Sequence, residues 1–144
     1  MQLTIYTDYA LRVLIYLGLQ PAEKLSNIKE IASFYNISSN HLSKVVYELG
    51  KLGILETVRG RNGGIRLSKN PTQINIGQVV RCTESPITIV ECFDDEKNSC
   101  KISPACRLKG ILHEALNAYL TVLDAYTLED LLSNKDRLNE FLLK

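Results

Sequence analysis

The sequence has neither a secretory leader nor a long uninterrupted run of apolar residues. Its first 21 residues contain no basic stretch and no small-residue cleavage site, and Asp8 and Arg12 interrupt their apolar run. Export needs a basic stretch and a cleavage site, and a membrane span needs a long apolar run, so we expect a cytoplasmic protein with no membrane partner. Internal repeats and low-complexity segments are also absent from the sequence. The 144 residues, of which 45% are hydrophobic, suffice for one ordinary domain with a single core.

The chain has almost no net charge, but its charges are segregated. The formal net charge is +1. Six basic and only two acidic residues lie between residues 38 and 70, whereas five acidic residues and no basic one lie between residues 84 and 96. A local positive patch attracts a polyanion even when the whole chain is nearly neutral. The first of these segments is therefore a candidate for binding nucleic acid.

Apolar periodicity predicts two helices in the first quarter of the chain. Residues 5–17 are apolar on almost every side, as in a helix buried in a core, and Gly18 follows them. A second helix is expected from about residue 28 to residue 36, where apolar residues recur three and four apart. Asn27 and Glu30 have the spacing of a capping box at its start.

A third helix is predicted to begin near Ser38 or Ser39 and to end at Gly53. Its apolar face is expected to bury Leu42, Val45, Val46, Leu49 and Leu52. Its first turn and its other face carry groups that can form hydrogen bonds with DNA: Ser38, Ser39, Asn40, His41, Ser43, Lys44, Tyr47 and Lys51. This arrangement is typical of a recognition helix in the major groove.

A β-hairpin is expected after the third helix. Residues 54–58 alternate like a strand, the turn is rich in glycine and arginine, and a second short strand follows. Arg59, Arg61 and Asn62 would form its tip, which can lie along the DNA backbone or in the minor groove. The predicted fold class is therefore mainly α with a small β-hairpin wing, a winged helix-turn-helix. The alternative is an ordinary small α+β core whose surface happens to be basic.

The second half of the chain is predicted to be helical apart from one loop. A short helix is expected over residues 74–84, and a long helix over residues 107–126, roughly 30 Å at about 1.5 Å per residue. The long helix has an apolar series with steps of four and three, which predicts a coiled-coil seam with a second copy of the chain. The seam comprises Leu108, Leu112, Ala115, Tyr119, Val122 and Tyr126, and is widened by Ile111, Leu116, Leu120 and Leu123. Packing within the same chain is the alternative.

These elements suggest three parts. Residues 1–83 would form the DNA-binding domain, residues 84–106 a cysteine-containing loop, and residues 107–144 the dimerisation helix with one or two short C-terminal helices.

The loop sequence ECFDDEKNSCKISPAC contains three of the four cysteines. Cys92, Cys100 and Cys106 are separated by seven and five residues. Structural zinc usually takes close cysteine pairs, and a thiol switch needs only two thiols. The wider gaps favour an iron–sulfur cluster, although a fourth thiolate is missing from the loop. Cys82 lies in an apolar helical pattern, which favours a structural role.

A thiol or metal-dependent enzyme is a further alternative. It would need a base and an electropositive setting beside the thiols, whereas the loop carries Asp94, Asp95 and Glu96. No enzymatic activity is therefore expected.

Five stretches together resemble the winged-helix iron–sulfur transcriptional regulators. They are LTIYTDYALRVLIYL, SSNHLSKVVYELGKLG, VRGRNGGIRLS, INIGQVVRCTE and IVECFDDEKNSCKISPAC. The likeness covers nearly the whole chain, and the cysteine spacing is that of the family's nitric-oxide-sensing repressors.

The resemblance implies a homodimer that binds a palindromic operator in double-stranded DNA and releases it after reaction with nitric oxide. It also implies a 4Fe-4S cluster held by the three loop cysteines of one subunit and by Asp8 of the other. Family members with a 2Fe-2S cluster use a histidine three residues after the last cysteine, where this chain has Lys109. A 2Fe-2S cluster and other signals, such as oxidants, iron status or a sulfur metabolite, are the alternatives. His113 is a weaker candidate ligand.

Overall fold

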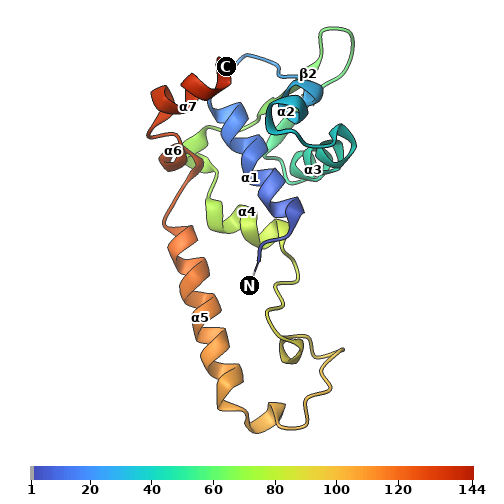
Figure 1. Ribbon diagram of the computed structural model, residues 1–144, viewed down its shortest axis with the longest axis vertical. Coiled ribbons are helices and arrows are strands. Elements are labelled where there is room, and N and C mark those ends of the chain that lie inside the picture. The colour runs from blue at the N-terminus through green and yellow to red at the C-terminus, as the bar shows by residue number, and fades with distance from the viewer. Residues whose placement is uncertain (1) are drawn as a thin grey trace.

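The computed structural model describes residues 2–144 and contains mainly helices, with one two-stranded sheet (Figure 1). The main helices are α1 (Ile5–Gly18), α2 (Ile28–Tyr35), α3 (Ser39–Lys51), α4 (Ile76–Thr83), α5 (Arg107–Asp124), α6 (Leu128–Leu131) and α7 (Lys135–Leu142). The strands are β1 (Leu55–Val58) and β2 (Gly64–Leu67), and the short 3-10 turns are η1 (Pro71–Gln73), η2 (Glu91–Phe93) and η3 (Ser103–Ala105). The helix-rich chain with one hairpin confirms the predicted fold class.

Helix α1 is the centre of the hydrophobic core. Thr4 caps its N-terminus by accepting a hydrogen bond from the N–H of Thr7. Ala10, Val13 and Leu14 are completely buried, as the apolar pattern predicted. The helix contacts α3, α4, α6 and β2. One buried helix therefore holds α3, the β-hairpin and the C-terminal segment together.

The start of α2 differs from the prediction. Asn27 caps the helix as expected, accepting a hydrogen bond from the N–H of Lys29 at 2.8 Å. Glu30, however, does not complete a capping box, because its carboxylate accepts a hydrogen bond from the hydroxyl of Tyr16 at 3.0 Å. Burial and this bond to Glu30 raise the pKa of Tyr16 to about 12. The residue expected to close the cap therefore links α2 to α1.

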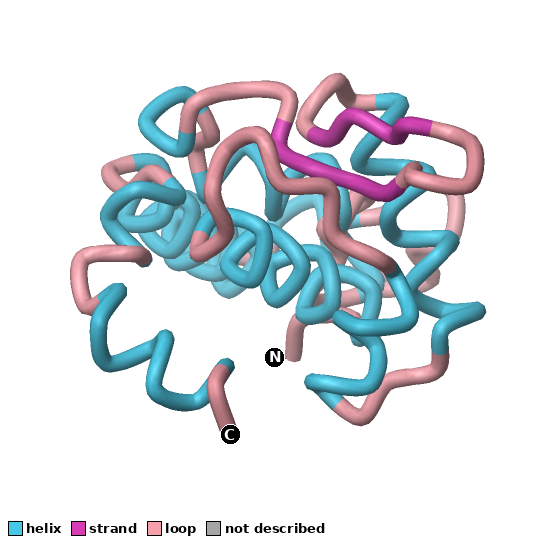
Figure 2. The backbone as a smooth tube through the Cα atoms, turned by 90° about the horizontal axis from the view of Figure 1, so that it is seen from above, coloured by secondary structure: helices cyan, strands magenta, loops and turns pink. Residues whose placement is uncertain are grey.

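Helix α3 and the hairpin follow the predicted order. Leu42, Val45, Val46 and Leu49 are buried as expected, but Leu52 is 41% exposed. The prediction for Leu52 was wrong because α3 ends at Lys51, so Leu52 leaves the helical period at the C-cap. The antiparallel register pairs residue 55 with 67 and residue 58 with 64. Figure 2 shows the hairpin at one side of the helices.

Helices α4 and α5 enclose a second, smaller core. Val80 of α4 is packed with Leu116 and Leu120 of α5, and all three are at most 8% exposed. These two leucines were expected to widen a dimer seam, but they face the interior of their own chain. The N-terminal half of α5 extends away from the other helices, beside the loop that carries the cysteines (Figure 1).

The short C-terminal helices return to the core around α1. Leu128 of α6 is completely buried and Leu132 is 7% exposed, both in the same core as α1. Residues 107–144 were predicted as one part, and this division stays a prediction. Helix α6 packs against α1 and belongs to the same hydrophobic core.

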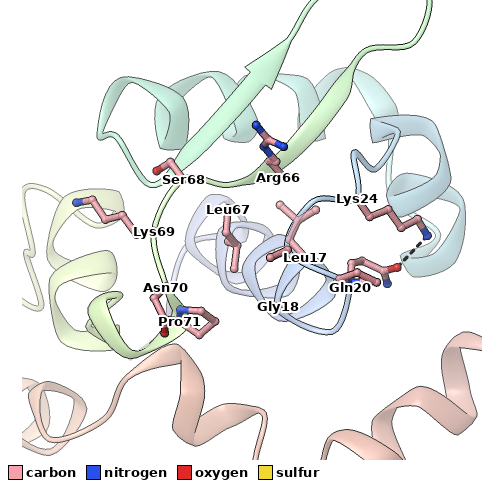
Figure 3. Close-up of a pocket in the computed structure, with 12 residues that line it drawn as sticks. Leu17, Gly18, Gln20, Lys24, Arg66, Leu67, Ser68, Lys69, Asn70 and Pro71 are labelled. Atoms are coloured by element: carbon pink, nitrogen blue, oxygen red, sulfur yellow. Dashed lines mark hydrogen bonds between the residues drawn. The ribbon is translucent and has the colours of Figure 1, made fainter.

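A pocket of about 290 Å³ lies between the end of α1 and the segment after β2 (Figure 3). Its cationic lining residues are Lys24, Arg66 and Lys69. Lys24 donates a hydrogen bond to Gln20 at 2.9 Å, and Arg66 pairs with Glu56 at 2.8 Å. None of the residues predicted to bind DNA or metal lines this pocket. Among residues 2–144, no helix combines the length and hydrophobicity required to span a membrane.

Leu128→Ala should lower the free energy of unfolding by about 2–5 kcal/mol, because it leaves a cavity where α6 completes the core around α1. Urea denaturation followed by circular dichroism measures this change. The matched variant Leu143→Ala removes a leucine that is 89% exposed, and should change stability by about 0.5 kcal/mol or less. Equal effects of the two substitutions would show that α6 does not stabilise the core.

Candidate nucleic-acid interface and metal centre

The outward face of α3 presents the predicted DNA-binding side chains. Ser38, Asn40, His41, Ser43, Lys44, Tyr47 and Lys51 are exposed, and Ser39 is half-buried. Lys51 lies 3.4 Å from a carboxylate oxygen of Glu48 and 5.5 Å from the ring centre of Tyr47. An exposed ion pair of this kind contributes little stability, so phosphate can displace Glu48 from Lys51 at small cost.

The wing tip is equally open. Arg59, Arg61 and Asn62 are exposed in the turn between β1 and β2. Gly60 has a φ of +111°, which L side chains rarely adopt, so glycine allows the chain to reverse between the two arginines. In the strands below, Arg66 is held by Glu56, whereas no ion pair is found for Arg59 or Arg61 among the described residues. The two tip guanidinium groups are thus available to an anion.

The three loop cysteines occupy different local settings. Cys92 lies in η2, Cys106 is the N-cap of α5, and the N–H of Cys100 donates a hydrogen bond to Asn98 at 3.1 Å. All three thiols are free and half-buried. Phe93, next to Cys92, is stacked on His113 of α5, with 3.8 Å between ring centroids and 11° between planes. This stack attaches the first cysteine's segment to the long helix.

The chemistry of these donors fits an iron–sulfur cluster. Thiolates are the usual ligands of such clusters, and the positive end of α5 at Cys106 favours negative charge. Within residues 2–144, however, no three His, Cys, Asp or Glu side chains lie close enough together to hold a metal ion. The single chain supplies the donors on one loop but does not bring them together. Cys82 is exposed on α4, separate from the loop, so its expected buried structural role is not seen.

Asp8 is in the first turn of α1 and is accessible to a partner. Its side chain is 46% exposed and forms an ion pair with Arg12 at 2.8 Å. A second contact joins Arg12 Nε to Asp8 Oδ1 at 3.1 Å. Arg12 was not among the predicted site residues, although a carboxylate and a guanidinium four residues apart on a helix predict an ion pair. Arg12 therefore compensates the charge of Asp8 on the same helix.

A hydrogen-bonded clasp joins the helix of Asp8 to the start of the cysteine loop. Glu84 follows α4 directly, and its Oε1 accepts hydrogen bonds from the N–H of Thr4 at 2.6 Å and from the hydroxyl of Thr4 at 2.8 Å. The hydroxyl of Thr7 donates to that of Thr83 at 2.9 Å. The sequence carries no signal for this clasp, because its partners are about 80 residues apart.

The pKa of Glu84 reflects this clasp. Burial alone would raise the pKa, but the hydrogen bonds donated by Thr4 outweigh burial and hold it below the ordinary value of 4.5. The hydroxyl of Thr7 donates its proton to Thr83, so the two hydrogen bonds to Glu84 both come from Thr4. The clasp therefore depends on an ionised Glu84.

The predicted dimer seam divides into exposed and half-buried positions. Leu108 and Val122 are each 59% exposed, Tyr126 is 48% exposed, and Ala115 is exposed. Leu112 and Tyr119 are half-buried, and Tyr119 packs on the second core. Ile111, at 51%, adds to the exposed apolar side of α5.

Comparisons with known proteins agree with this geometry. The model of the Rrf2 family, described as iron-dependent transcriptional regulator, matches residues 3–134. A relative from Halalkalibacterium halodurans named HTH-type transcriptional regulator NsrR is 63% identical over 99% of this chain and 97% of its own. The solved structure of CymR, the global cysteine regulator of B. subtilis, is 30% identical, with a TM-score of 0.66 over 93% of this chain and 98% of that one. T. potens IscR, 22% identical, shares the fold, with a TM-score of 0.72 over 93% and 88% of the two chains.

These relatives settle two predictions from the sequence. The family model matches residues 3–134 and the 63% identical relative is named NsrR, so the predicted resemblance is confirmed. The relatives are named as transcriptional regulators and not as enzymes, which confirms the expectation of no enzymatic activity.

Glu84→Gln should lower stability by about 1 kcal/mol or less at neutral pH, because the neutral amide accepts hydrogen bonds from Thr4 less strongly than a carboxylate. The folded-state pKa of Glu84 is below its unfolded value, so its contribution is complete above about pH 4.5 and is lost as pH falls through the folded pKa. Urea denaturation between about pH 7 and pH 3.5 should show the two proteins converging in acid. Glu140→Gln makes the same substitution at an exposed position on α7, and its stability at neutral pH should stay within about 0.5 kcal/mol of wild type. A gap between Glu84→Gln and wild type that stays constant with pH would contradict the ionised clasp.

Proposed function

The chain belongs to the Rrf2 family of iron-dependent transcriptional regulators, and on this premise we propose that it is a homodimeric repressor controlled by an iron–sulfur cluster and nitric oxide. The cluster is proposed as 4Fe-4S, with Cys92, Cys100 and Cys106 as ligands from one subunit and Asp8 from its partner. Its target would be a palindromic operator in double-stranded DNA.

The observation that carries the DNA-binding part is the joint exposure of the α3 face and the wing tip. Both belong to one rigid unit, since α3 and β2 contact α1. The N-terminal side chains of α3 can reach base edges in the major groove. Arg59 and Arg61 can neutralise phosphates or enter a narrow minor groove beside it.

The homodimer is supported by the exposed side of α5. Leu108, Ile111 and Val122 are each more than half exposed, and they lie along one helix that extends from the DNA-binding core. Water-exposed leucine, isoleucine and valine on one side of a helix are stabilised when a second helix covers them. A symmetric dimer would present two α3 helices to two half-sites.

The proposed ligand set divides the metal centre between two chains. The loop thiols would hold most of the iron, and the half-exposed Asp8 can turn from Arg12 towards a partner's loop. When bound, the cluster would supply iron that reacts with a small diatomic such as nitric oxide, most readily where a carboxylate holds it less tightly than thiolate.

Asp8 would also transmit the signal. While it binds the partner's centre, it ties α1 to the other subunit's loop; once released, it can return to Arg12 on its own helix. Because α1 holds α3 and β2, this change would shift one DNA-reading unit relative to the other. About 3 kcal/mol of coupling alters affinity on the order of 100-fold, enough for a genetic switch.

A regulator that senses a sulfur metabolite is the second candidate. It is supported by the 30% identity to a structure described as a global cysteine regulator. The much higher identity to a relative named NsrR favours the first candidate. Titrating the purified protein with nitric oxide and with cysteine while measuring DNA binding separates the two.

Cys106→Ala should abolish both the visible absorbance of anaerobically purified protein and its tight, sequence-specific DNA binding, because a proposed cluster ligand is lost. Absorbance spectra and gel shifts measure the two effects. Cys82→Ala is the matched control, since Cys82 lies outside the loop, and it should retain both. Asp8→Asn should keep part of the absorbance but weaken the response of DNA binding to nitric oxide. A colourless wild type that binds its operator tightly would refute the cluster-dependent mechanism.

Arg61→Ala should weaken binding to a mixed-sequence DNA duplex and reduce the slope of log affinity against log salt by about one. Removing one guanidinium from the wing removes about one phosphate contact. Fluorescence anisotropy over a range of salt concentrations measures the slope. Arg137→Ala removes an exposed arginine from α7 and should leave the slope unchanged. Identical slopes for wild type and Arg61→Ala would mean that the wing tip does not touch DNA.

A further inference from the structure

Asp124 joins the long helix α5 to α4 through an ion pair with two hydrogen bonds. It is the last residue of α5, and both of its carboxylate oxygens are bound by Arg81 of α4. The contact from Arg81 Nη2 to Asp124 Oδ2 is 2.7 Å. Two parallel N–H···O bonds fix direction as well as distance. The pair therefore restrains the direction of α5 relative to α4 at this point.

Backbone bonds reinforce the same junction. Asn75 caps α4 and also donates a side-chain hydrogen bond to the carbonyl of Asp124 at 2.7 Å. The N–H of Ile76 donates to the carbonyl of Tyr126 at 3.0 Å, and the N–H of Leu128 donates to the carbonyl of Ile74 at 2.8 Å. Asp124 and the residues that follow it are thus bound to the start of α4 and the residues just before it.

Gly77 allows this close approach. A Cβ added there would overlap the carboxylate of Asp124 and lie 2.9 Å from its backbone nitrogen. Any other residue would push α5 away from α4 at this point. The junction consequently has little freedom to slide.

The rest of α5 has few supports. Leu116 and Leu120 pack on Val80, but the residues before Leu116 extend beyond the core with Leu108 and Ile111 exposed. Helix α5 is therefore attached to the core through its C-terminal half, and its N-terminal half projects from the core. Neighbouring base pairs are about 3.4 Å apart, so a small rotation at the junction is enough to displace a DNA-reading unit by one step.

We propose that Asp124, held by Arg81, is a positioning residue that sets the distance between the two DNA-reading units and thereby selects the spacing of the operator half-sites. The inference rests on the proposed homodimer, in which the exposed side of α5 meets a second copy. Among residues 2–144, no side-chain hydrogen bond or ion pair joins Arg81 or Asp124 to α3 or the wing, so they act on spacing and not on the bases read within each half-site.

The test is a binding selection from a library of DNA duplexes with about 30 randomised base pairs, which covers two half-sites about one helical turn apart. Full-length wild type, Asp124→Asn and Arg81→Gln are compared, and the recovered half-site sequence and the spacer length are read separately. Wild type should enrich one spacer about tenfold over spacers longer or shorter by one base pair. Both variants should recover the same half-site, with this preference reduced to about threefold or less.

Two controls separate positioning from general stability. Asp130→Asn makes the same carboxylate-to-amide change where Asp130 accepts a hydrogen bond from the N–H of Thr127 at 2.7 Å, and it should keep the spacer preference of wild type. Arg81→Lys keeps the charge but not the paired bonds, and should give an intermediate preference. Both side chains of the Arg81 and Asp124 pair are about 40% exposed, so the variants retain their core.

The outcomes are distinct. An unchanged spacer preference in folded Asp124→Asn and Arg81→Gln would overturn the inference and leave the proposed function intact. A wild type that recovers single half-sites without a preferred spacer would overturn the two-headed binding in the proposed function, and the inference with it. An equal loss of preference in Asp130→Asn would show that reduced stability, and not the junction, is responsible.

Discussion

Helix α1 is in contact with α3, α4, α6 and β2 at once, and the rest of the molecule depends on its burial. Its inner residues Ala10, Val13 and Leu14 have no exposed surface, so each neighbouring element is placed by packing on the same side chains. Its first turn, by contrast, is open and carries Asp8. One helix therefore combines a fixed interior with an accessible charged end, as the proposed transmission of a signal through Asp8 requires.

The predictable parts of the fold are those in which local pattern and tertiary packing agree. The winged helix-turn-helix followed from apolar spacing, the helix ends and a glycine-rich turn, and the structure has each element within a few residues of its predicted limits. Leu52 and Glu30 were misjudged for a common reason. Each fits a local rule, but the end of α3 and the hydroxyl of Tyr16 decide the outcome.

The candidate site was predictable only where its signal is local. The exposed α3 face and wing tip follow from helical and turn periodicity. The role of the cysteines was predicted from their spacing and from resemblance, that of Asp8 from resemblance alone, and both stay predictions. Glu84 with Thr4, and Arg81 with Asp124, are pairs about 80 and 40 residues apart. Nothing in the spacing of a single sequence marks such pairs, because each residue taken alone is an ordinary surface charge or helix cap.

The position of α6 has a consequence for synthesis of the chain. Leu128 fills the core that begins with α1, so residues near both ends must meet before the DNA-binding unit is complete. A nascent chain on the ribosome can form α1, α3 and the hairpin, but their shared interior stays open until the last segment emerges. Premature stop codons after α5 would therefore yield products whose operator contacts are all encoded but whose recognition unit cannot close, and which proteases would remove.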